Sequence, residues 1–184
     1  MSIVARTRMT SGEFIAWAMR RREGERWELV GGELVAMSPE RSGHALVKAG
    51  VWRVLDNGIK ARGLGCTVYP DGMAVEIDDG TVYEPDALVR CGAPLDDDAV
   101  KITDPLIVVE VLSPSSQARD AGAKLADYAR LPSLRHYLLV DTKTRAIVHH
   151  RIDDGAGIHT RILREGSLDL DPPGIRLELV DLFG

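Results

Sequence analysis

The segment 105–112, PLIVVEVL, constrains the fold more than any other part of the chain. A nearly continuous apolar run is typical of a central strand covered on both faces, whereas a strand with one solvated face alternates apolar and polar residues. The run therefore predicts a sheet with other layers packed on both sides. Glu110 is out of character in it, because burying a carboxylate without a partner costs several kcal/mol. We therefore expect a neutralising group beside Glu110.

The pattern around this strand mixes helices and strands. A helix over 11–22 opens with Thr10 and Glu13 at capping-box spacing, and Gly31-Gly32 joins two alternating segments in the manner of a tight hairpin. Further helices are predicted at 42–62 and 117–130, and strands at 26–30, 33–37, 66–70, 73–77, 81–89, 136–141, 146–152, 158–163 and 175–180. This order predicts an α/β (α+β mixed) fold with a mixed central sheet flanked by helices.

Composition limits the classes of protein to consider. With 184 residues, 45% of them hydrophobic and 28% charged, the chain has the size and balance of one globular domain, which we expect to span residues 1–184. The net charge of −5 does not indicate a protein that binds polyanions over its whole surface. Any nucleic acid would have to be bound by a local patch.

Three further features concern the cellular compartment. No apolar run approaches the roughly 20 residues needed to cross a bilayer. Residues 1–14 lack the apolar core and cleavage site of a secretory signal, so we expect a cytoplasmic protein. Cys66 and Cys91 do not have the spacing of a zinc site and are expected to be free thiols.

Asp86 and Glu110 are the candidate metal ligands. Asp86 follows Pro85 within a predicted strand. If that strand lies next to the strand of Glu110, the two carboxylates can converge on one hard cation such as Mg²⁺. Alternatively, Asp86 caps the end of a strand and Glu110 pairs with an arginine. Spacing alone leaves both interpretations open.

A lysine follows on the next predicted helix. Asp120, Lys124 and Tyr128 recur at intervals of four residues and so share one helix face, just after the strand that carries Glu110. Lys124 could lean over the carboxylates to hold an attacking water or a phosphate oxygen. The alternative is an exposed ion pair between Asp120 and Lys124, which is common at this spacing and contributes little to stability.

Three segments of the sequence resemble the Uma-two family of restriction-endonuclease-like proteins: WELVGGELVAMSPERSGH, YEPDALV and PLIVVEVLSPSSQARDAGAKLADYARLPSLRHYLLVD. The resemblance extends over nearly the whole chain, and its most specific part is the block EVLSPS-x-x-x-RD-x-x-x-KL-x-x-Y. It implies a restriction-endonuclease-like fold with an added N-terminal helix and hairpin.

That family is similar to the PD-(D/E)XK nucleases, whose metal ligands are an Asp on one strand and an acid on the next, followed two residues later by a lysine. The resemblance places Asp86 and Glu110 at the two acidic positions. Leu112 occupies the usual lysine position, so Lys124 on the following helix is the substitute. The resemblance also implies the backbone carbonyl of Val111 as a further metal ligand.

Glu28 and His44 stand where the family usually has the same residue types. Glu28 is a candidate for an extra metal or water contact, and the alternative is a hairpin glutamate that faces solvent. His44, at a helix start, is a candidate for contacting a phosphate or carrying a proton. The alternative is a histidine bonded to the backbone.

The residues and the resemblance lead to the hypothesis of a Mg²⁺- or Mn²⁺-dependent endonuclease that hydrolyses DNA phosphodiester bonds. Asp86 and Glu110 would hold the metal, and Lys124 would stabilise the transition state. Because cutting both strands of a duplex usually requires two centres, we expect a homodimer. The rival hypothesis is a non-catalytic nucleic-acid-binding or assembly module on a nuclease scaffold, which the acidic net charge and the displaced lysine favour.

Overall fold

The computed structural model describes residues 8–21, 24–112, 118–153, 155 and 157–183, and for residues 118–121 it describes the backbone alone. Residues 113–117, where the sequence predicts a turn and a helix cap, lie outside this part. The helices of the described part are α1 (Ser11–Ala18), α2 (Ser42–Ala61), α3 (Ala118–Tyr128) and α4 (Leu179–Phe183). None of them is both long enough and apolar enough to cross a membrane.

The strands of the described part agree with most of the predicted ones. They are β1 (Trp27–Val30), β2 (Glu33–Ala36), β3 (Cys66–Pro70), β4 (Ala74–Asp78), β5 (Thr81–Tyr83), β6 (Ala87–Cys91), β7 (Lys101–Ile102), β8 (Ile107–Leu112), β9 (His136–Asp141), β10 (Ala146–Asp153), β11 (Gly157–Leu163), β12 (Ser167–Leu170) and β13 (Ile175–Glu178). The sequence missed β7, β12 and α4, each of five residues or fewer.

Two sheets contain most of these strands. The larger sheet has the order β11-β10-β9-β8-β6-β3, and the smaller has the order β2-β1-β5-β4-β7. Within the larger sheet β8 runs parallel to β9 and antiparallel to β6. The predicted mixed α/β class with a mixed central sheet is therefore confirmed, and the strands of the first half divide between this sheet and the smaller one.

Pro85 is the reason for this division. The sequence predicts one strand over 81–89, but β5 ends at Tyr83 in the smaller sheet and β6 begins at Ala87 in the larger one. Proline has no N–H to donate to a ladder and restricts the backbone of the residue before it. The chain therefore changes sheets just before β6, which places Asp86 at the junction of the two sheets.

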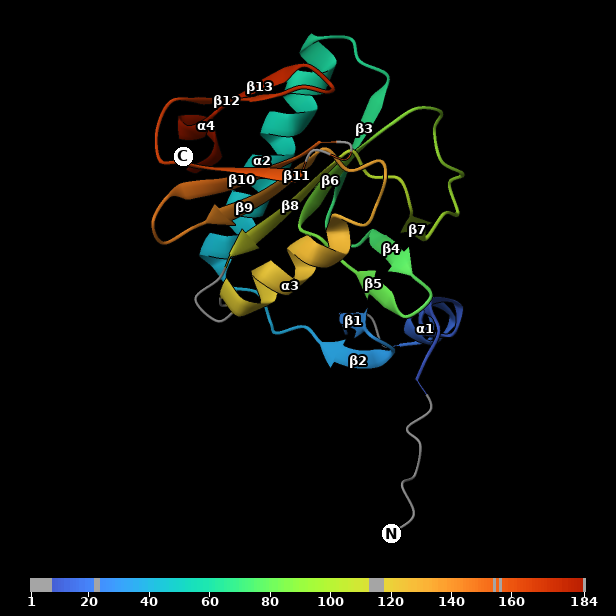
Figure 1. Ribbon diagram of the computed structural model, residues 1–184. Helices are drawn as coiled ribbons and strands as arrows, with labels where there is room; N and C mark the ends of the chain where they lie inside the picture. Colours follow the sequence, from blue (N-terminus) through green and yellow to red (C-terminus); the bar gives the residue numbers. More distant parts are fainter. Residues whose placement is uncertain (1–7, 22–23, 113–117, 154, 156, 184) are drawn as a thin grey trace.

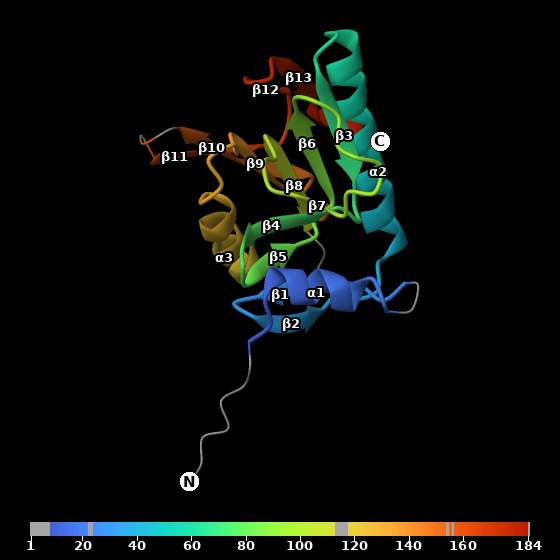
Figure 2. The ribbon, with the colours of Figure 1, turned by 90° about the vertical axis from the view of Figure 1, so that its right-hand side faces the viewer.

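The strand β8 lies inside the larger sheet, between β6 and β9, as its apolar sequence predicts. Figures 1 and 2 show α2 on one side of this sheet and α3 on the other. Val109 packs in a core cluster with Leu55 of α2, whereas Val108 packs in a second cluster with Tyr128 of α3. Successive residues of β8 thus face different cores, which is the two-sided burial expected of a central strand.

The predicted hairpin and its first helix form a separate layer. β1 pairs with β2 around Gly31-Gly32, whose φ values of 56° and 83° suit the tight turn that favours glycine. α1 packs Phe14 onto Leu29 of β1 and ends at Ala18, earlier than predicted. Figure 2 shows α1, β1 and β2 together below the larger sheet. This layer brings β1 toward the junction at which Asp86 lies, since β1 pairs with β5.

The cysteines correct the sequence-based interpretation. Cys66 and Cys91 are not free thiols but form a disulfide. They lie opposite each other on β3 and β6, with their Cα atoms 3.9 Å apart. Their sequence separation of 25 gave no indication of this pairing, which the antiparallel register of the two strands produces.

Candidate active site

The two predicted metal ligands lie at neighbouring positions of adjacent chain segments, Asp86 just before β6 and Glu110 within β8. Ala87 of β6 lies opposite Val109 of the antiparallel strand β8. Asp86 precedes Ala87 and Glu110 follows Val109, so the ladder brings them side by side. The backbone N–H of Val111 donates to Asp86 Oδ2 at 2.6 Å, which fixes the Asp86 carboxylate against β8.

Lys124 reaches Glu110 from α3. Its Nζ atom lies 3.0 Å from Glu110 Oε1 and 2.8 Å from Glu28 Oε1. The Tyr128 hydroxyl, one helical turn further along α3, donates to Glu110 Oε1 at 3.2 Å. We call Glu28, Glu110, Lys124 and Tyr128 the Lys124 cluster. Glu28 does not face solvent as its alternative expected, because it is only 7% exposed, and Lys124 bonds to both Glu28 and Glu110. The side chain of Asp120 lies outside the described part.

The charges in the Lys124 cluster are unevenly balanced. Burial, helped by the charges of Asp86 and Glu28 and opposed by Lys124, raises the pKa of Glu110 to about 7. Burial by itself would lower the pKa of Lys124, but Glu110 and Glu28 outweigh it and hold that pKa above its ordinary value. Lys124 is therefore a permanent cation. Glu110 changes between its protonated and ionised forms near neutral pH.

A second lysine, Lys48 of α2, stands beside Asp86. Its Nζ atom lies 2.5 Å from Asp71 Oδ2, 2.8 Å from Glu40 Oε1 and 3.2 Å from Asp86 Oδ1. Burial would lower the pKa of Lys48, but its hydrogen bonds to Asp71 and Glu40 and the charge of Asp86 raise it. Lys48 is therefore also a cation. We call Glu40, His44, Lys48, Asp71 and Asp86 the Lys48 cluster.

His44, one helical turn before Lys48, bonds to oxygen atoms through both ring nitrogens. Nδ1 lies 2.7 Å from Glu40 Oε1, and Nε2 lies 2.6 Å from the backbone carbonyl of Val111. A carbonyl and a carboxylate only accept, so the doubly protonated imidazolium is the form that satisfies both contacts. Nε2 is also 3.8 Å from Asp86 Oδ2. His44 thus bonds to the backbone, but to that of β8 rather than that of its own helix.

Arg26 joins the two clusters into one charged network. It pairs with Asp71 at 2.8 Å and with Glu84 at 3.1 Å, and the backbone N–H of Glu84 donates to Glu28 at 3.1 Å. In the described part of the chain, six carboxylates of this network face four basic side chains, namely Glu28, Glu40, Asp71, Glu84, Asp86 and Glu110 against Arg26, His44, Lys48 and Lys124. The network is short of positive charge.

The donor set and this charge deficit fit a hard divalent cation, which prefers oxygen ligands. The carboxylates of Asp86 and Glu110 and the carbonyl of Val111 are oxygen donors from adjacent backbone positions. A second grouping, Glu40, His44 and Asp86, places one ligand atom of each residue within 4.8 Å of the others. Asp86 belongs to both groupings, so it is the residue on which a metal would depend most.

Sequence reasoning missed Lys48, Glu40, Asp71 and Arg26. A signal for Lys48 was present, since it falls at helical spacing on the buried side of α2 with Val51 and Leu55. A lysine on an apolar stripe is as unexpected as Glu110 in an apolar strand. The acids carry no comparable signal, because they lie in loops whose neighbours are decided by the fold.

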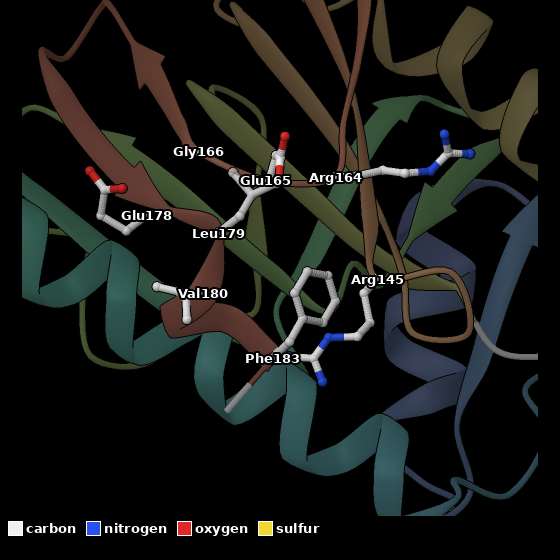
Figure 3. Close-up of a pocket in the computed structure, with 8 residues that line it drawn as sticks. All are labelled: Arg145, Arg164, Glu165, Gly166, Glu178, Leu179, Val180 and Phe183. Atoms are coloured by element: carbon white, nitrogen blue, oxygen red, sulfur yellow. The ribbon is translucent and has the colours of Figure 1, made fainter.

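A hollow of about 280 Å³ lies elsewhere, beside α4 (Figure 3). Its lining residues are Arg145, Arg164, Glu165, Gly166, Glu178, Leu179, Val180 and Phe183. The Arg145 guanidinium lies 5.3 Å from the centre of the Phe183 ring. None of these lining residues belongs to the charged network, so the hollow is separate from the candidate site.

Comparison with known proteins places this geometry in context. Residues 12–181 match the model of the Uma2 family, described as "Putative restriction endonuclease". The chain is 30% identical to the uncharacterized protein slr1290 of Synechocystis sp. over 91% of this chain and 87% of that protein. It is 25% identical to a second Synechocystis protein, sll1609, over 91% of this chain and 95% of the other.

The fold also has a counterpart among solved structures. The crystal structure of a "putative nuclease belonging to DUF820" from Anabaena variabilis superposes with a TM-score of 0.77, over 95% of this chain and 97% of that chain. The two sequences are 14% identical, so the likeness concerns the fold alone. It confirms the expected nuclease-like fold.

Proposed function

Because the chain belongs to the Uma2 family, whose description is that of a restriction endonuclease, we propose that it is a Mg²⁺- or Mn²⁺-dependent endonuclease that hydrolyses DNA phosphodiester bonds. One observation carries the proposal. Asp86 comes directly before β6 and Glu110 lies on the neighbouring strand β8, near enough for the charge of Asp86 to raise the pKa of Glu110, and a half-buried lysine from α3 bonds to Glu110. If Lys124 served only to form a stabilising ion pair with Glu110, the second acid, Asp86, would not be needed beside it.

The protein's own groups have distinct roles in this proposal. Asp86, Glu110 and the Val111 carbonyl hold the metal. When bound, a divalent cation supplies Lewis acidity toward the phosphate and a water of lowered pKa. Lys124, a permanent cation, stabilises the negative charge that develops on the phosphate. Glu28 positions the Lys124 ammonium from the opposite side at 2.8 Å.

His44 completes the set of proposed groups. Beside the Val111 carbonyl and Asp86, its ring is placed to contact a substrate phosphate and to carry a proton to a leaving oxygen. We propose DNA as the partner and a homodimer as the assembly that cuts both strands. A net charge of −5 means that DNA contacts are local and depend strongly on salt.

A plasmid assay tests the proposed function. The purified protein is expected to nick supercoiled DNA with Mg²⁺ or Mn²⁺ and to leave it intact with a chelator. Asp86→Ala is expected to abolish nicking and to weaken Mn²⁺ binding in calorimetry. Asp97→Ala, which changes an exposed loop acid, is the matched control and should retain activity.

The same assay addresses the rival function. The full pairing of Lys48 and Lys124 with carboxylates favours a module that does not act on phosphate. DNA binding without cleavage in either metal would support that module and contradict the nuclease. Equal nicking by the wild type and Asp86→Ala would contradict the proposed centre.

A further inference from the structure

Lys48 has no role in the chemistry proposed above, although it contacts the residue on which that chemistry depends most. Its side chain is 8% exposed, and its ammonium faces acids from three separate segments: Glu40 before α2, Asp71 after β3 and Asp86 before β6. A single carboxylate would neutralise one lysine. Three of them, one for each N–H donor, indicate an ammonium held at a defined place in the site.

The three contacts differ in length. Lys48 Nζ lies 2.5 Å from Asp71 and 2.8 Å from Glu40, but 3.2 Å from Asp86. Asp71 and Glu40 therefore suffice to hold the ammonium, and the contact with Asp86 is the one most easily given up. Giving it up would leave one N–H donor free next to Asp86.

The two carboxylate oxygens of Asp86 have different partners. Oδ2 accepts the N–H of Val111 at 2.6 Å, and Oδ1 faces the ammonium. A cation that binds Oδ1 must therefore compete with Lys48. The positive charge of Lys48 also lowers the attraction of the site for any second cation.

We propose that Lys48 is a second lysine of the site: it pairs with Asp86 in the metal-free protein, and it binds the substrate phosphate once a divalent cation takes its place at Asp86. The proposal rests on the proposed function for the identity of the substrate. The first part, in which Lys48 and the cation compete for Asp86, concerns metal binding alone and does not depend on whether the protein cleaves DNA.

The first test measures Mn²⁺ binding without DNA. Lys48→Met removes the competing charge and keeps the aliphatic stem, so Mn²⁺ is expected to bind about tenfold more tightly in calorimetry. Lys60→Met is the matched control, since Lys60 lies on the same helix, is 72% exposed and pairs with Asp56 one helical turn away. It should bind Mn²⁺ as the wild type does. Unchanged or weaker binding by a folded Lys48→Met protein would overturn the competition.

A second variant protects this test against a folding defect. Lys48→Arg keeps the charge and offers a carboxylate two parallel N–H bonds, so it should bind Mn²⁺ no more tightly than the wild type. If Lys48→Met unfolds in chelator, Mn²⁺ is expected to restore its folding, because the cation replaces the missing charge. Tighter binding by Lys48→Arg, or a Lys48→Met protein that Mn²⁺ does not refold, would overturn the proposal.

The last test concerns the phosphate. In Ca²⁺, a short DNA duplex is expected to bind Lys48→Met about tenfold more weakly than the wild type, with a smaller dependence on salt. A merely structural lysine would not tighten metal binding while weakening DNA binding. Equal DNA affinity would overturn the phosphate role. If no variant cleaves DNA but the order of Mn²⁺ affinities holds, the nuclease proposal fails and the metal competition stands.

Discussion

The Lys124 and Lys48 clusters use the same components in different proportions. Each holds one of the two strand carboxylates with a lysine, and each anchors that lysine with a glutamate from the N-terminal part of the chain, Glu28 or Glu40. The Lys48 cluster contains a second basic side chain, His44, whereas the Lys124 cluster has only the Tyr128 hydroxyl in addition. Glu110 is the acid whose burial most raises its pKa, and the charge of Lys124 opposes that shift only in part.

The comparison separates two kinds of effect. Substitutions in the Lys124 cluster are expected to change the chemical step and the pH dependence of stability. Substitutions of Lys48 are expected to change the affinity for metal. The difference follows from position: both lysines contact a proposed metal ligand, but Lys48 contacts Asp86, which belongs to both groupings of ligand atoms, whereas Lys124 contacts Glu110, which belongs to one of them.

The largest expected effect is that of Lys124→Met on cleavage. The variant keeps the aliphatic stem but loses the charge, so plasmid nicking should fall by roughly a hundredfold or more, while folding and Mn²⁺ binding survive. Nicking rates and calorimetry on the same preparations measure both, with Lys60→Met as the control. Near-normal nicking by Lys124→Met, with Asp86→Ala inactive, would show that the two lysines do not differ as proposed.

The next effect concerns the stability of the metal-free protein. Folding raises the pKa of Glu110 from 4.5 to about 7, so the stabilisation associated with its protonated form is complete below about pH 4.5 and is lost as the pH rises through about 7. Glu110→Gln stays neutral at every pH and avoids this loss, which amounts to a difference on the order of 3 kcal/mol between acidic and alkaline pH.

Denaturant unfolding in chelator at about pH 5 and about pH 8 measures that difference. The variant should gain stability over the wild type as the pH rises, whereas Glu25→Gln, which changes an exposed acid, should show no such gain. A Glu110→Gln protein that is less stable than the wild type at the higher pH would contradict the charge deficit around Glu110.

The smallest expected effect is that of Tyr128→Phe. The substitution removes the hydroxyl that donates to Glu110 and should cost about 1 kcal/mol of unfolding free energy. Tyr137→Phe is a matched control, because the Tyr137 hydroxyl is buried and has no hydrogen-bond partner in the described part of the chain. Equal losses in the two variants would mean that Glu110 does not depend on the Tyr128 donor.

Much of the fold followed from local patterns. The apolar run around Glu110 predicted a strand covered on both faces, and β8 is such a strand. Helical spacing predicted the α2 helix almost to the residue, and Gly31-Gly32 predicted the hairpin. These predictions succeed because strand and helix periodicities depend on residues two to four positions apart in the chain.

The same reasoning could identify only some residues of the candidate site. Glu110 and Lys48 each break an apolar pattern, so burial of a charge marks them in the sequence. Glu40 and Asp71 lie in loops, where an acid is unremarkable. The sequence left the partner of Lys124 open between Asp120 and the strand carboxylates, and its contact with Glu28 depends on where β1 packs.

By itself, the sequence determined most of the longer elements and the unusual place of Glu110 in an apolar strand, because those properties depend on neighbours along the chain. The tertiary structure decided that Pro85 divides the strands between two sheets, that Cys66 meets Cys91, and which acid each buried lysine contacts. Contacts of this kind join segments tens of residues apart. Their energies depend on distance and burial, which only the packing of the sheets and helices sets.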